Sequence, residues 1–163
     1  MTPNSAGPKD ELVRRHRTAT LVVAGFLILD IALLAIAYFA ADRIHRPGDQ
    51  VRDAWIVNGL WIALLVFGLG AFVIRRTKFA AMRLKDIAAL RGVSGLLKTL
   101  QDTTIQVACL GGAIALMGFM IPIRTGDWTH MLRAGGVSAI VLVYCFPLRG
   151  AWERVVMQLG RDD

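Results

Sequence analysis

The sequence predicts an all-α integral membrane protein, a four-helix bundle built from two antiparallel transmembrane hairpins with both termini in the cytoplasm. Hydrophobic residues make up 55% of the 163 residues and the mean hydropathy is +0.53, whereas soluble domains have an apolar share of roughly 45–50%. Four apolar stretches approach the length of about 20 residues that crosses a bilayer. The basic residues concentrate in the segments that two hairpins would place on one side.

Residues 1–18 form a polar tail that carries Lys9, Arg14, Arg15 and Arg17 ahead of the first apolar stretch. That stretch is longer than the roughly 7 to 15 apolar residues of a secretory signal peptide. We therefore expect it to remain in the protein as a membrane span.

The expected spans are residues 19–41, 54–74, 103–123 and 131–148. Pro-Gly and Gly-Asp turns occur in the short connections within each pair, and helices joined by short connections pack as antiparallel neighbours. The first transmembrane hairpin is thus predicted at 19–74 and the second at 103–148, and residues 149–163 form a C-terminal segment.

Orientation follows from the basic residues, because short cytoplasmic loops carry an excess of Lys and Arg. Fourteen of the 19 lie in the tail, the middle loop and the C-terminal segment. Both termini are therefore expected in the cytoplasm of a multi-pass plasma-membrane protein, with the bacterial inner membrane as the natural setting. The net charge is +7. The basic residues behind it flank the apolar stretches, which favours anionic lipid headgroups over nucleic acid as the partner.

The middle loop, residues 75–102, alternates cations with apolar residues and is interrupted near Gly92 and Ser94. One interpretation places it as a basic amphipathic helix on the inner leaflet, with its leucine face in the acyl boundary. In the other, the second and third spans continue into the cytoplasm as a helical pair that offers a docking surface. The expected headgroup contacts are Arg75, Arg76, Lys78, Arg83, Lys85, Arg91 and Lys98.

Asp30 is the acidic residue inside an expected span, about 16 Å deep along the first helix. A carboxyl group there costs about 2.5 to 3.5 kcal/mol on insertion scales and normally faces protein or water. It is either an inter-helix hydrogen-bonding group that specifies assembly or a proton or cation site. By depth, its expected partners are Ser138 and Asn58.

Small residues mark close helix contacts in membranes. On the first helix they lie opposite Asp30, so one of these two faces would need a second subunit to cover it. An oligomer or a heteromeric membrane complex is therefore expected. The predicted packing positions are Ala24, Gly25, Ala32, Ala35, Ala108, Gly111, Gly112, Ala115, Gly135 and Ala139.

The sequence lacks a Gly-rich phosphate loop, a nucleophile elbow and a metalloprotease helix motif. All three histidines fall outside the expected spans, and we expect no cofactor and no metal. The leading hypothesis is a non-enzymatic assembly or accessory subunit of a membrane complex. The alternative is a channel or transporter subunit that uses Asp30 to conduct protons or ions.

Overall fold

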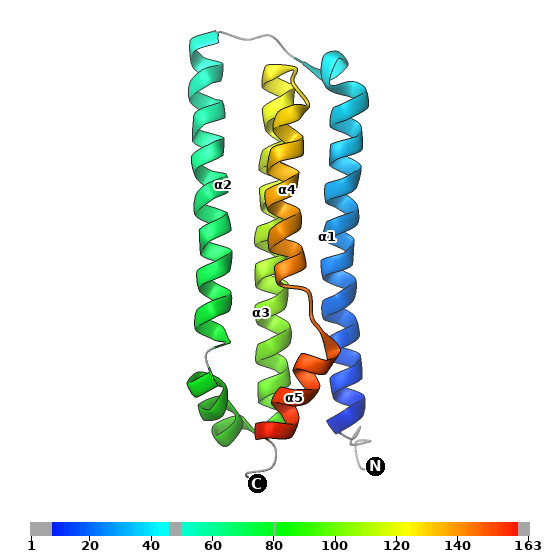
Figure 1. The fold of residues 1–163 in the computed structure, drawn as a ribbon, viewed down its shortest axis with the longest axis vertical. Helices are drawn as coiled ribbons and strands as arrows, with labels where there is room; N and C mark the ends of the chain where they lie inside the picture. The colour runs from blue at the N-terminus through cyan, green and yellow to red at the C-terminus, as the bar shows by residue number, and fades with distance from the viewer. Residues whose placement is uncertain (1–7, 46–49, 80, 160–163) are drawn as a thin grey trace, which may run out of the picture.

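The computed structural model describes residues 8–45, 50–79 and 81–159, and these are all-helical, without a strand. The helices are α1 (Pro8–Ile44), α2 (Gln50–Lys78), α3 (Ala81–Thr125), α4 (Thr129–Tyr144) and α5 (Arg149–Leu159) (Figure 1). Within α3 the backbone breaks at Gly92, whose φ of 64° and ψ of −172° suit a residue without a Cβ. The long part of α3 therefore starts after Gly92.

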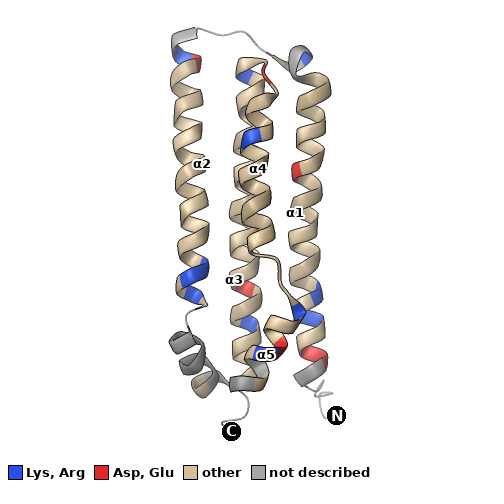
Figure 2. Ribbon diagram, in the orientation of Figure 1, with Lys and Arg blue, Asp and Glu red and all other residues tan. Residues whose placement is uncertain are grey.

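Three helices are long and apolar enough to cross a membrane, over Asp10–Ala40, Arg52–Lys78 and Gly92–Thr125. This suggests a membrane protein, as the composition predicted. Charged residues gather toward the two ends of the long helices, and few lie between them (Figure 2). Large apolar side chains such as Ile28, Ile62 and Ile140 are exposed along the middle.

The fourth apolar stretch does not form one continuous helix over 131–148. α4 ends at Tyr144, the chain leaves the helix at residues 145–148, and α5 follows at a bend of 40°. Pro147 accounts for the break, because it lacks an N–H and disfavours helical backbone in the preceding residue. The pair reaches spanning length only if α4 and α5 count as one bent segment.

α3 is the central helix. It packs against α1, α2 and α4, while α1 and α2 lie on opposite sides of the α3–α4 pair (Figure 1). The predicted first hairpin is therefore wrong in its packing: over the described residues, α1 and α2 are consecutive but pack on α3 rather than on each other. The short connection between α1 and α2 makes the two helices run in opposite directions, but packing on α3 determines where each of them lies.

The end of the molecule where α1 begins and α5 lies, here called the α5 end, has a core of its own. Leu12 of α1 and Trp152 of α5 pack there with Leu96, Leu97 and Leu100 of α3. Residues 93–102 of the predicted middle loop thus belong to α3, and their leucines face α1 and α5. The inner-leaflet interpretation is wrong for this part, because protein already covers the apolar face.

Candidate functional site

Asp30 is buried at the contact between α1 and α4, with 5% of its surface exposed. One of its carboxylate oxygens, Oδ1, would lie 3.2 Å from a Cβ added at Gly135. The missing side chain at Gly135 therefore allows the carboxyl group to approach the α4 backbone. Ser138, one turn further along α4, lies beside the same carboxyl group.

Ser138 links this site to α3 as well. It is fully buried, and its hydroxyl donates a hydrogen bond of 2.9 Å to the carbonyl oxygen of Gly111. The carbonyl thus takes the one hydroxyl proton, which leaves lone pairs on Ser138 Oγ. A protonated Asp30 could donate to that oxygen and complete a chain from α1 through α4 to α3.

The structure brings Ser138 to Asp30 but does not bring Asn58 there. Asn58 is exposed on α2, a helix that packs on α3 and α4 rather than on α1. Asn58 was expected from its depth along the bilayer normal, but depth does not determine which face of a helix a residue lies on. The pairing with Asn58 is therefore not supported.

The two faces of α1 differ as its helical periodicity predicts. The neighbours on the Asp30 side, among them Val23, Leu33 and Ala37, are buried. The opposite face is open: Gly25, Ala32 and Ala35 are exposed and Ala24 is half-buried. Of the two arrangements that the sequence allowed, the structure has Asp30 inside and the small residues outside.

The predicted small residues of α3 and α4 lie at close helix contacts. A Cβ at Gly111 would meet Leu142, and one at Gly112 would overlap the ring of Phe26. Gly118, which was not among the predicted packing positions, faces Ala134 closely enough that an added Cβ would overlap the alanine Cβ. Of the other predicted positions on these two helices, Ala139 is half-buried, and three are buried: Ala108, Ala115 and Gly135.

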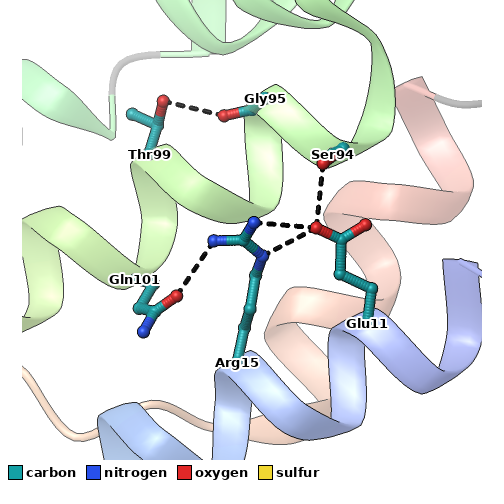
Figure 3. Close-up of polar contacts among 6 residues, drawn as sticks. All are labelled: Glu11, Arg15, Ser94, Gly95, Thr99 and Gln101. Carbon is teal, nitrogen blue, oxygen red and sulfur yellow. Dashed lines mark hydrogen bonds and ion pairs between the residues drawn. The ribbon is translucent and has the colours of Figure 1, made fainter. Parts of the chain in front are cut away.

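A polar cluster at the α5 end joins α1 to α3 (Figure 3). Arg15 makes an ion pair of 2.8 Å with Glu11 one turn earlier, and its Nη1 donates to the Gln101 side chain at 3.1 Å. The Ser94 hydroxyl donates to the same Glu11 oxygen at 2.8 Å. The hydrogen bond from Ser94 and then that from Arg15 lower the pKa of Glu11.

This cluster was not anticipated from the sequence. Glu11 and Arg15 stand four residues apart, the spacing of an ion pair on one helix face, but their partners are more than eighty residues away in the chain. Nearby, His16 Nε2 lies 2.8 Å from the Pro147 carbonyl oxygen, which joins α1 to the segment between α4 and α5.

The expected headgroup residues lie near the α5 end of α2 and α3. Arg76 and Lys98 are exposed, whereas Lys78 is half-buried. The side chains of the remaining three on α3, Arg83, Lys85 and Arg91, lie outside the described residues.

Arg75 differs from the others. Its guanidinium carbon lies 4.1 Å from the centre of the Tyr144 ring, a cation–π contact between α2 and α4. Nothing in the sequence indicates this contact, because Arg75 falls in the predicted middle loop and Tyr144 in the predicted second hairpin.

Within the described ranges, no group of three or more His, Cys, Asp or Glu is arranged to hold a metal ion. No family model, curated protein or solved structure matches the chain. The candidate functional features of the structure are Asp30, the exposed face of α1 and the basic residues at the α5 end.

Proposed function

We propose that the chain is a small multispan membrane protein that acts as a non-enzymatic assembly or accessory subunit of a membrane complex. In this proposal α1, α2, α3 and the α4–α5 segment form a four-helix bundle in a bacterial inner membrane. Both termini lie in the cytoplasm, so the α5 end is the cytoplasmic end. The excess of basic residues in the segments at that end supports the orientation.

One observation carries the assembly role. Asp30 is turned inward, and the opposite face of α1 exposes Gly25, Ala32 and Ala35 beside large apolar side chains such as Ile28. In lipid there is little hydrophobic driving force between helices, so close backbone approach at small residues is the main source of association. This face of α1 suits a second transmembrane helix, from another copy or from a different subunit.

The test is the association of the reconstituted protein as a function of the protein-to-lipid ratio, measured by energy transfer between labelled copies. Ala32→Leu should weaken association by several-fold, because the added side chain separates the backbones. Gly59→Leu is the matched control, since Gly59 is exposed on α2 with nothing within 4 Å of an added Cβ. If wild type stays monomeric at every ratio, self-association is wrong. The assembly role would then require that another membrane protein co-purifies with wild type and that Ala32→Leu abolishes this co-purification.

A second candidate function, proton or ion conduction through Asp30, is favoured by one specific observation. Asp30 Oδ1 is buried and has no hydrogen-bond partner among the described residues. A buried carboxyl group with spare hydrogen-bonding capacity is a candidate for a transport site.

Liposome flux measurements separate the two functions. If Asp30 conducts, wild type should show proton or cation flux, and Asp30→Asn should abolish it while leaving the melting temperature in detergent little changed. Under the assembly proposal neither protein conducts. Ser138→Ala is the companion variant, because it removes the hydroxyl beside Asp30 without changing its charge.

A further inference from the structure

An apolar groove runs between α2 and α4. It consists of two adjoining cavities of about 520 and 340 Å³ that share Gly68 and Val137 in their walls. On α2 the lining extends from Trp61 to Phe72, and Tyr144 of α4 lies at the same end as Phe72. The groove is open, because α2 and α4 contact each other much less than each contacts α3.

Two aromatic rings line the Phe72 end of the groove, and a cation lies next to one of them. The rings of Phe72 and Tyr144 stack with centroids 5.6 Å apart, and the Arg75 guanidinium lies over the Tyr144 ring. Arg75 Nη1 is buried and has no hydrogen-bond partner among the described residues. A buried guanidinium nitrogen without a partner is costly, and an anion is the ligand that compensates it best.

We propose that this groove binds one anionic phospholipid of the inner leaflet, with an acyl chain between α2 and α4 and the phosphate on Arg75. The lining from Trp61 to Phe72 rises about 16 Å along α2. This is about half of the roughly 30 Å hydrocarbon thickness, the depth of one leaflet. The inference rests on the proposed insertion and orientation of α2 and α4, but not on the assembly role.

Charge favours an anionic phospholipid over the other occupants. An apolar helix from a second copy would fill the groove but leave Arg75 Nη1 without a partner. A zwitterionic lipid offers the phosphate together with a cationic group, which Arg75 repels. Phosphatidylglycerol offers the phosphate without that cation.

The experiment measures lipid binding to the full chain in detergent by native mass spectrometry, using phosphatidylglycerol and phosphatidylcholine with the same acyl chains. Wild type should bind phosphatidylglycerol more tightly. Arg75→Gln should weaken this binding roughly tenfold, the effect of one lost charge-assisted hydrogen bond, and should remove the preference between the two lipids. Arg76→Gln, the neighbouring exposed arginine, should retain both.

A second variant tests the groove itself. Gly68→Leu places a side chain in the shared wall, where an added Cβ has Val137 as its nearest neighbour at 3.9 Å. It should weaken binding of both lipids, and glycerophosphoglycerol, which lacks acyl chains, should not compete. The helical content and melting temperature of each variant show that it has folded.

Three outcomes would overturn the proposal. Equal losses in Arg75→Gln and Arg76→Gln would indicate general attraction to a basic surface. Unchanged lipid binding in Gly68→Leu would mean that the groove is not the site. Loss of self-association in Gly68→Leu would identify a second copy as the occupant of the groove. Failure of the lipid proposal is distinguishable from failure of the assembly proposal, because the assembly test uses a variant on the α1 face.

Discussion

The two flanking helices, α1 and α2, pack on the same central helix in different ways. In the most apolar 18-residue stretch of each helix, 50% of α3 is buried, whereas 22% of α1 and 11% of α2 are buried. α1 is held by apolar contacts and by polar groups at two levels, Asp30 beside α4 and Arg15 beside α3. α2 makes mainly apolar contacts and leaves a groove beside α4.

This difference shows that equal hydropathy does not mean equal roles. Both helices are apolar enough to span a bilayer, but α1 carries a buried carboxyl group, Asp30, along its length, whereas the polar contacts of α2 lie near its two ends, at Asp53 and Arg75. We infer that α1, α3 and α4 form the fixed part of the molecule and that α2 is its adaptable part.

The largest effect is expected where α3 and α4 approach most closely. Gly118→Ala adds a Cβ that overlaps the Ala134 Cβ, and neither atom can rotate away, so the two helices must separate. The expected destabilisation is on the order of 1–3 kcal/mol, measured by unfolding in mixed detergent micelles.

Gly136→Ala is the matched control, because an added Cβ at this α4 position has nothing within 4 Å. It should be neutral or slightly stabilising, since Ala favours helix over Gly. Similar losses in both variants would mean that the α3–α4 contact is looser than the structure indicates.

A smaller effect is expected at Asp30. If the Asp30–Ser138 contact joins α1 to α4, Asp30→Asn and Ser138→Ala should be coupled in a double-mutant cycle by about 0.6 to 1.7 kcal/mol, as for hydrogen bonds between membrane helices. The measurement is the unfolding free energy of the four proteins in one detergent.

The matched cycle pairs Asp30→Asn with Asn58→Ala. Because Asn58 is exposed on α2, these two changes should be additive. Additivity in both cycles would show that Asp30 is not held by Ser138 and would strengthen the transport alternative.

These residues also show how far the sequence could be read. Helical periodicity placed Asp30 and the small residues on opposite faces of α1 without showing which face turns inward, and small residues located the contacts of α3. Which helix lies beside α1 could not be derived, because loop length allows two helices to be neighbours without requiring it. The Arg75–Tyr144 contact and the Glu11–Ser94 hydrogen bond could not be predicted for the same reason. Each joins residues of different segments, and these segments meet only through their packing on α3.

The polar cluster at the α5 end should make that end sensitive to pH. Hydrogen bonds lower the pKa of Glu11 below its ordinary value of 4.5, so the carboxylate contributes stability above that pH. The contribution is lost as the pH falls through the lowered pKa, because protonation removes the charge that Arg15 and Ser94 contact.

Hydrogen exchange of the α1 and α3 amides at pH 7 and at acidic pH measures this effect. At pH 7, Glu11→Gln should exchange faster than wild type at the α5 end, and the difference should shrink on acidification. Glu153→Gln removes a more exposed pair with Arg149 within α5, and it should change little at either pH. A pH-independent difference for Glu11→Gln would indicate a role in packing instead of charge.

The smallest effect is expected at the far end of α2, where Arg124 of α3 pairs with Asp53 at 3.4 Å. The pair is long and partly exposed, so Asp53→Asn should lower the unfolding free energy by no more than about 1 kcal/mol. It should still widen the distance distribution between spin labels placed on α2 and α3, because few polar groups hold α2 in place. The equivalent distribution between α1 and α3 should be unchanged. If it widens equally, the two sides of α3 respond together and α2 is not the separate, adaptable part of the molecule.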